Sequence, residues 1–99
     1  MEIRIQAVKF TATEKLEAYI NKKLQKLTKA NDDIVFIDVF LKVTKPEAAE
    51  NKEVEIKIQN KSGDFFASKT SDTFEESTDS VIDALEKQLA KYKEKLRSK

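Results

Sequence analysis

Apolar and polar residues alternate along three stretches of the chain, with the period expected of β-strands that bury one face. In the first stretch, Ile3, Ile5 and Ala7 alternate with Glu2, Arg4 and Gln6. The second covers residues 34–44, and its apolar face is formed by the odd-numbered residues Val35, Ile37, Val39, Leu41 and Val43. The third places Val54, Ile56 and Ile58 between Glu53, Glu55, Lys57 and Gln59. Each stretch therefore predicts a strand with one side turned toward a core.

A turn motif follows the third predicted strand. Residues 60–64, with the sequence NKSGD, contain the residue types that favour a hairpin turn. We therefore expect residues 65–69 to form a short fourth strand that returns alongside the third.

Two other stretches have the spacing of amphipathic helices. In the first, Thr11 and Glu14 are spaced as in a capping box, and an Ala-Asn-Asp-Asp sequence near residue 30 ends the helix. Its apolar side is formed by Leu16, Ile20, Leu24 and Leu27. In the second, Asp72 and Glu75 repeat the capping-box spacing. Its apolar side is formed by Phe74, Val81, Leu85, Leu89, Tyr92 and Leu96.

The predicted order of elements is β-α-β-β-β-α, an α+β fold. A four-stranded sheet with both helices on one face is the simplest arrangement that buries every apolar face. With 99 residues, 39% hydrophobic and 37% charged, we expect one globular domain over residues 1–99. No apolar run approaches the roughly 20 residues of a membrane-spanning helix. Because the N-terminal sequence MEIRIQAV also lacks the apolar block of a signal peptide, we expect a cytoplasmic protein without a membrane partner.

The residue types that carry most enzymatic chemistry are absent from the sequence. There is no Cys and no His, which removes thiolate nucleophiles, imidazole bases and the commonest metal ligands. The single glycine, Gly63, cannot build a phosphate-binding loop, which needs several glycines. Asp32 and Asp33 are better explained by the turn that ends the first helix than by a cation site. We therefore expect no catalytic residue, no metal, no cofactor and no small-molecule substrate.

Lysines gather on one side of the first predicted helix. At about 100° per residue, a narrow stripe opposite the apolar side is formed by Lys15, Tyr19, Lys22, Lys26 and Lys29. Lys23 lies on the basic side of the apolar residues, whereas Glu14 and Glu17 lie on the other flank. The acids are thus separated from the lysines instead of alternating with them at i,i+4.

The second helix also has one flank without acids. This flank carries Thr73, Ser77, Ser80, Ala84, Lys87, Gln88, Lys91 and Lys95. The other flank carries Glu75, Glu76, Asp79, Asp83 and Glu86, followed by Lys93 and Arg97. The small neutral half of the acid-free flank would let a polyanion such as RNA approach closely, and its lysines would neutralise phosphates. The alternative is that these lysines have only a structural role. Lysines near the C-terminus of a helix stabilise it by opposing the negative end of the helix dipole, and solvated helix faces are usually charged.

Aromatic residues leave two further alternatives open. Tyr19, within the basic stripe, could stack on a base or pack against lysine stems. Phe36, Phe40 and Phe66 fall on the outer face of the predicted sheet, where they could bind a protein partner or pack against one another across strands. A protein-interaction module and an RNA-binding protein that acts away from ribosomes are therefore alternative functions.

Four stretches resemble the ribosome hibernation-promoting factors, also described as ribosome-associated translation inhibitors, in their short form. They are KKLQKL at residues 22–27, IVFIDVFLKVTK at residues 34–45, FFAS at residues 65–68 and IDALEKQLAKYKEKL at residues 82–96. None is a catalytic signature. The resemblance extends over nearly the whole chain and includes the order of elements.

The resemblance implies a fold related to double-stranded-RNA-binding domains and a function without chemistry. It implies a factor, monomeric when free, that lodges in the decoding channel of the small ribosomal subunit and blocks the sites of messenger and transfer RNA. Together with the charge pattern, it predicts that ribosomal RNA is bound by Lys22, Lys23, Lys26, Lys29, Lys87, Lys91, Lys93, Lys95 and Arg97. This chain departs from the family in its acidic Glu75, Glu76 and Asp79. The dimerisation domain of the long form is missing, so pairing of ribosomes would require another protein.

Overall fold

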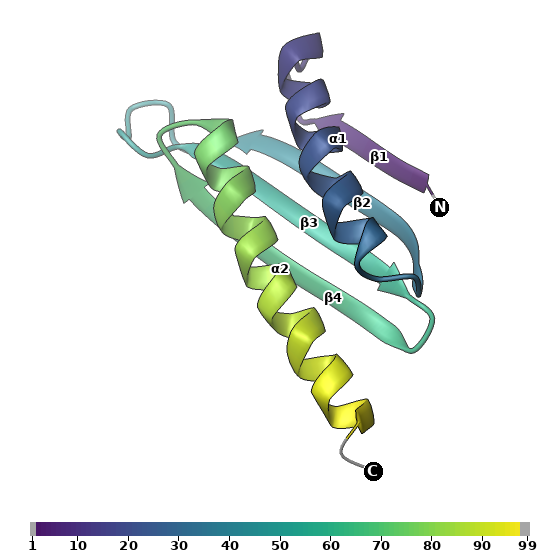
Figure 1. Ribbon diagram of the computed structural model, residues 1–99. Coiled ribbons are helices and arrows are strands. Elements are labelled where there is room, and N and C mark those ends of the chain that lie inside the picture. Colours follow the sequence, from purple (N-terminus) through teal and green to yellow (C-terminus); the bar gives the residue numbers. More distant parts are fainter. Residues whose placement is uncertain (1, 98–99) are drawn as a thin grey trace.

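A computed structural model describes residues 2–97 of the chain, with side chains as far as Lys95 (Figure 1). The elements follow one another as β1 (Glu2–Ala7), α1 (Glu14–Lys29), β2 (Ile34–Val43), β3 (Lys52–Asn60), β4 (Gly63–Ser71) and α2 (Phe74–Arg97). The predicted β-α-β-β-β-α order is confirmed.

The four strands form one mixed sheet in the order β1-β2-β3-β4. Strand β1 runs parallel to β2, and the remaining neighbours are antiparallel. A parallel pair needs a crossover between its strands, and α1 supplies it. Both helices cover the same face of the sheet (Figure 1), as predicted, and no described element covers the other face.

The core lies between this face of the sheet and the two helices. Its largest fully buried apolar side chains are Ile20, Leu24, Ile37, Val39, Leu41, Val54, Ile56, Ile58, Val81 and Leu85. All of them were predicted from the alternating or helical spacing. Since burying one such side chain contributes about 1.5–3 kcal/mol, this layer of contacts dominates the stability of the fold.

The two ends of β2 depart from the predicted alternation. Ile34 is buried, whereas Val35 is 45% exposed, because the register with β3 shifts between Ile34 and Phe36. Such a bulge turns successive side chains to the opposite faces. Val43, the last residue of β2, is 40% exposed. The prediction that Val35 and Val43 belong to the buried face was therefore wrong.

Both helices begin later than their sequences suggest. Thr13, not Thr11, caps α1, and its Oγ1 accepts a hydrogen bond of 3.1 Å from the backbone N–H of Leu16. Thr73, not Asp72, caps α2, and its Oγ1 accepts a hydrogen bond of 3.1 Å from the backbone N–H of Glu76.

A stacked aromatic pair accompanies the late start of α1. Lys9 has a left-handed φ of 65°, and the Phe10 ring stacks on that of Phe74 with 5.4 Å between centroids. This contact holds the chain before α1 against the first residue of α2. Residues 11–13 therefore lie outside the helix, and a capping pattern that considers only local spacing cannot detect this.

Ser77 belongs to the core instead of the exposed flank on which it was predicted. It is fully buried, its Oγ donates to the Lys52 carbonyl at 2.5 Å, and it lies 2.8 Å from Ser71 Oγ. Ser80 remains exposed and Ala84 is half-buried. Fewer small neutral side chains are therefore exposed on that flank than predicted, because the Ser77 hydroxyl hydrogen-bonds to β3 and β4.

Replacing Ser77 by Ala is expected to lower the free energy of unfolding by about 1–3 kcal/mol, because the Lys52 carbonyl loses a buried donor. Ser80→Ala on the exposed side of the same helix should change it by no more than about 0.5 kcal/mol. Urea denaturation of both variants measures the difference. Equal effects of the two substitutions would show that the buried hydroxyl contributes nothing.

Candidate nucleic-acid interface

The lysines of α1 differ in what they face, and Lys26 both lines the groove toward α2 and is exposed without an ion pair among the described residues. Lys23 and Lys26 line a groove against α2, opposite Asp79, Asp83 and Glu86. Lys22, Lys26 and Lys29 are exposed, and no ion pair is found for them among the described residues. They are therefore free to bind an external anion.

The acidic flank of α2 lies against the basic side of α1. Lys23 Nζ lies 3.6 Å from Asp79 Oδ1, and the Tyr19 hydroxyl donates to both Asp79 carboxylate oxygens at 2.8 and 2.9 Å. The ammonium of Lys23 also lies 5.4 Å from the centre of the Tyr19 ring. Tyr19, a member of the basic stripe, thus contacts Lys23 on its own helix and an acid of the other helix. The sequence did not indicate this pairing, because it requires the packing angle of the two helices.

The lysines of α2 differ in their partners. Lys87 pairs with Asp83 at 3.3 Å, one turn away on the same helix. Lys93 Nζ donates to the Ala30 carbonyl at 2.5 Å and so satisfies one of the free carbonyls at the end of α1. Lys91 and Lys95 are exposed, with no partner among the described residues. The side chain of Arg97 lies outside the described residues.

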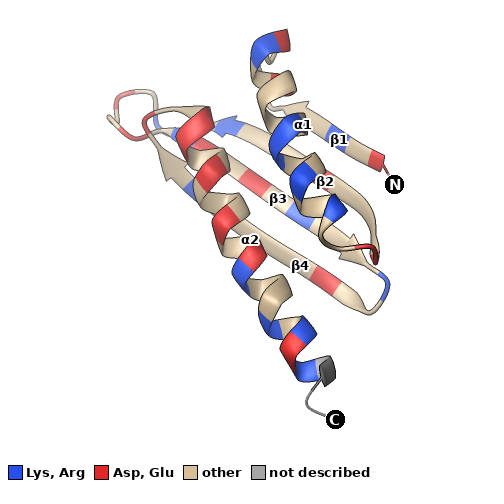
Figure 2. Ribbon diagram, in the orientation of Figure 1, with Lys and Arg blue, Asp and Glu red and all other residues tan. Residues whose placement is uncertain are grey.

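The two predicted basic surfaces do not merge into one. Gln88 Nε2 donates to the Phe66 carbonyl of β4 at 3.1 Å, which places the acid-free flank of α2 over the β4 edge of the sheet. Lys87, Lys91 and Lys95 share that flank, whereas Lys93 reaches toward α1. Figure 2 shows blue residues along α1 and the C-terminal half of α2, and red residues on the N-terminal half of α2. We name the group Lys22, Lys26 and Lys29 the α1 surface and the group Lys87, Lys91 and Lys95 the α2 surface.

The outer sheet face carries three separated aromatic side chains. Phe36 and Phe40 are half-buried and Phe66 is 54% exposed. Their neighbours on β3 are polar, in the pairs Phe36–Gln59, Phe40–Glu55 and Phe66–Lys57. The ring contacts found among the described residues join other pairs. Packing of the three rings against one another, one of the two uses left open by the sequence, is therefore not what the structure shows.

A polar network interrupts the aromatic residues on this face. Arg4 Nη2 donates to Asp38 Oδ2 at 3.1 Å, Gln6 Nε2 donates to Asp38 Oδ1 at 3.1 Å, and the Arg4 guanidinium lies 5.5 Å from the centre of the Phe36 ring. The pKa of Asp38 lies below its ordinary value, first because Arg4 donates hydrogen bonds to the carboxylate and also because Gln6 does. The face is thus charged and mixed, without the continuous apolar patch of a protein-binding surface.

Among the described residues, no three His, Cys, Asp or Glu side chains group closely enough to hold a metal ion. No helix within residues 2–97 has both the length and the apolar character needed to cross a membrane.

A sequence profile of the Sigma 54 modulation protein / S30EA ribosomal protein family matches residues 3–97. The chain therefore belongs to this family, which confirms the resemblance seen in its sequence. It is 29% identical over 98 residues to a ribosome hibernation promoting factor from Pseudomonas putida, covering 99% of this chain and 92% of that protein.

Two solved structures share the fold. A ribosomal subunit interface protein from Coxiella burnetii aligns with a TM-score of 0.84 at 25% identity, over 94% of this chain and 98% of that one. The N-terminal domain of Protein Y from Thermus thermophilus aligns with a TM-score of 0.78 at 22% identity, over 93% of this chain and 99% of that one.

The contact between Tyr19 and Asp79 makes a prediction about titration. The pKa of Tyr19 is raised above its ordinary value of 10.0, chiefly because its hydroxyl donates to Asp79. The contact therefore stabilises the fold below pH 10 and stops doing so as the pH rises through the raised pKa. Asp79→Asn should lower the pKa of Tyr19, because an amide does not repel the phenolate. Ultraviolet titration in a Tyr92→Phe background reports Tyr19 alone, and Asp83→Asn, which keeps the contact, should leave the pKa unchanged.

Proposed function

We propose that this protein is a ribosome hibernation factor that binds the small ribosomal subunit and silences translation. The observation that carries the proposal is the set of exposed lysines without intramolecular partners, Lys22, Lys26, Lys29, Lys91 and Lys95, on a fold shared with a ribosomal subunit interface protein. Lysines without a partner can neutralise phosphates without first breaking an ion pair. The relatives named as hibernation and subunit interface proteins support the ribosome as the source of those phosphates.

In this proposal the protein occupies the decoding channel and excludes messenger and transfer RNA. The α1 and α2 surfaces bind ribosomal RNA, and Arg97 extends the basic end of the chain. Lys23 and Lys87 each contribute less to the affinity for RNA. Before either can bind a phosphate, Lys23 must give up its ion pair with Asp79 and Lys87 its ion pair with Asp83. Lys93 contributes while it remains hydrogen-bonded to Ala30, since an ammonium has three donors.

The mechanism requires occupancy and no chemical step. A single domain over residues 1–99 acts as a monomer in the cytoplasm, where the ribosomes are, without a cofactor. A near-zero net charge of +1 favours a local basic surface over general affinity for nucleic acids.

Replacing Lys22, Lys26 and Lys29 by Gln together should weaken binding to small subunits and make its salt dependence shallower. Each lost phosphate contact reduces the slope of log affinity against log salt by about 0.7–0.9. Co-sedimentation with purified small subunits across a salt series measures both quantities. The matched control is Lys45, Lys57 and Lys61 to Gln, three exposed lysines outside both helices. If the control changes the slope as much as the α1 surface does, the lysines act only through net charge.

Blocking is separated from mere binding by competition. In a purified translation system, inhibition should follow the fraction of small subunits occupied, because two ligands that exclude each other lower each other's apparent affinity. Excess initiator transfer RNA and messenger should release the protein, and the ribosomal RNA should remain intact. Stable binding of the protein together with transfer RNA in the decoding site, or cleavage of the RNA, would sink the proposal. An RNA-binding protein that acts away from ribosomes would inhibit independently of subunit occupancy.

A further inference from the structure

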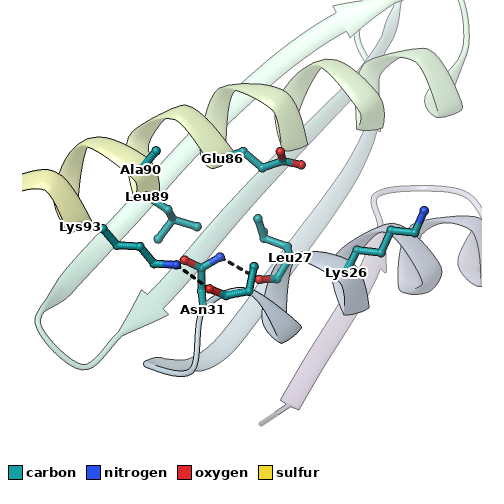
Figure 3. Close-up of a pocket in the computed structure, with 8 residues that line it drawn as sticks. Lys26, Leu27, Asn31, Glu86, Leu89, Ala90 and Lys93 are labelled. Atoms are coloured by element: carbon teal, nitrogen blue, oxygen red, sulfur yellow. Dashed lines mark hydrogen bonds between the residues drawn. The ribbon is translucent and has the colours of Figure 1, made fainter.

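A cavity of about 360 Å³ opens between the end of α1 and the C-terminal half of α2 (Figure 3). Leu27 from α1 and Leu89 and Ala90 from α2 line it with apolar side chains. Leu27 and Leu89 also belong to the hydrophobic core, so core packing fixes their positions whether the cavity is filled or not. The volume lies near the lower end of the range for ligand sites, roughly 300–1,000 Å³, and suits one small planar group.

Polar side chains surround the apolar part of the cavity. Asn31 lies between Lys93 and Leu27 (Figure 3). Its Nδ2 donates to the Leu27 carbonyl at 2.8 Å, which uses one of its two amide protons, and no donor to its Oδ1 is found among the described residues. Lys93 donates to the Ala30 carbonyl and keeps two further protons, and Glu86 adds an acceptor. The cavity therefore offers both donors and acceptors, as the edge of a nucleobase does.

The charges near the cavity favour a neutral group inside it and a phosphate outside it. Its lining holds two lysines, Lys26 and Lys93, and one acid, Glu86. The last turn of α1 also borders it, and the negative end of a helix dipole disfavours an anion placed there. Lys26 belongs to the α1 surface as well, together with the exposed Lys22 and Lys29. An RNA strand with its phosphates on the α1 surface can therefore place a base in the cavity.

We propose that this cavity binds a single unstacked nucleobase of the RNA that the α1 surface holds. The inference rests on the proposed function and deepens it, because it adds a base-binding site beside the phosphate-binding lysines. Single-stranded RNA is recognised through splayed bases that pack against side chains and form hydrogen bonds along their edges. The base packs on Leu89 and Ala90, and its edge binds Asn31 and the remaining protons of Lys93.

A peptide with acidic and apolar side chains is the competing occupant. Its carboxylates would be attracted by Lys26 and Lys93, but Glu86 would repel them. Asp32 and Asp33 line a smaller recess of about 60 Å³ that adjoins the cavity, and they would repel a carboxylate as well. The amino and imino groups of a base can donate to such acids. The observations therefore favour a nucleobase.

The test uses the full chain, labelled with nitrogen-15, and three probes. They are a short oligouridylate, an abasic oligomer of the same length and charge, and a peptide of alternating Glu and Leu. Oligouridylate should shift the side-chain amide signals of Asn31 and bind about tenfold more tightly than the abasic oligomer, because the base adds apolar contacts and hydrogen bonds that phosphates cannot supply. The abasic oligomer should leave the Asn31 signals in place.

Ala90→Leu fills the cavity without removing a lysine. Ala90 is exposed and leucine is a good helix former, so the variant should keep its melting temperature. It should lower the affinity for oligouridylate to that for the abasic oligomer, whose own affinity should change by less than about twofold because its phosphate contacts remain. Ala18→Leu, the same substitution at an exposed position of α1 outside the cavity, is the matched control and should change neither affinity.

Salt dependence separates this inference from the proposed function. Ala90→Leu should weaken small-subunit binding several-fold without changing its salt slope, whereas Lys22, Lys26 and Lys29 to Gln should make that slope shallower. If wild-type protein does not bind small subunits, the proposed function fails, but tighter binding of oligouridylate than of the abasic oligomer still supports the base site. The inference is overturned if these two oligomers bind equally well, or if the acidic peptide shifts Asn31 and oligouridylate does not.

Discussion

Burial of one face of the sheet beneath two helices is the constraint on which the rest of the structure depends. Leu24 of α1 and Leu85 of α2 are fully buried in one core cluster with Val39 and Ile56 of the sheet. Because each helix has only one apolar side, this burial fixes the rotation of both helices about their axes. The position of every charged residue on α1 and α2 follows from that rotation.

One consequence is that opposite charges meet between the helices. The same rotation that buries Leu85 turns Asp79 toward α1, where it contacts Tyr19 and Lys23. It also turns Lys91 toward the opposite side of α2, over the β4 edge on which Gln88 is anchored. Exposed ion pairs of this kind contribute at most about 1 kcal/mol to the stability of the fold. Their main consequence is that they determine which lysines have no carboxylate partner.

The distribution of free and paired charges gives the protein two kinds of surface. Lysines without partners lie on the outer side of α1 and on the β4 side of α2, where phosphates can reach them. The groove between the helices is lined by Asp79, Asp83 and Glu86 of α2 together with Lys23 and Lys26 of α1.

The sequence by itself determined the order of elements and the buried face of the strands at their centres, and it predicted which flanks of the helices carry lysines. These features repeat with periods of two or 3.6 residues, and burial of apolar side chains enforces those periods wherever the elements pack. Only the tertiary structure decided what depends on neighbours distant in the chain. The Phe10–Phe74 stack accompanies a cap at Thr13, and the register shift against β3 exposes Val35. The same holds for the candidate interface: Lys23 and Lys93 acquire partners because two helices separated by three strands meet over one sheet.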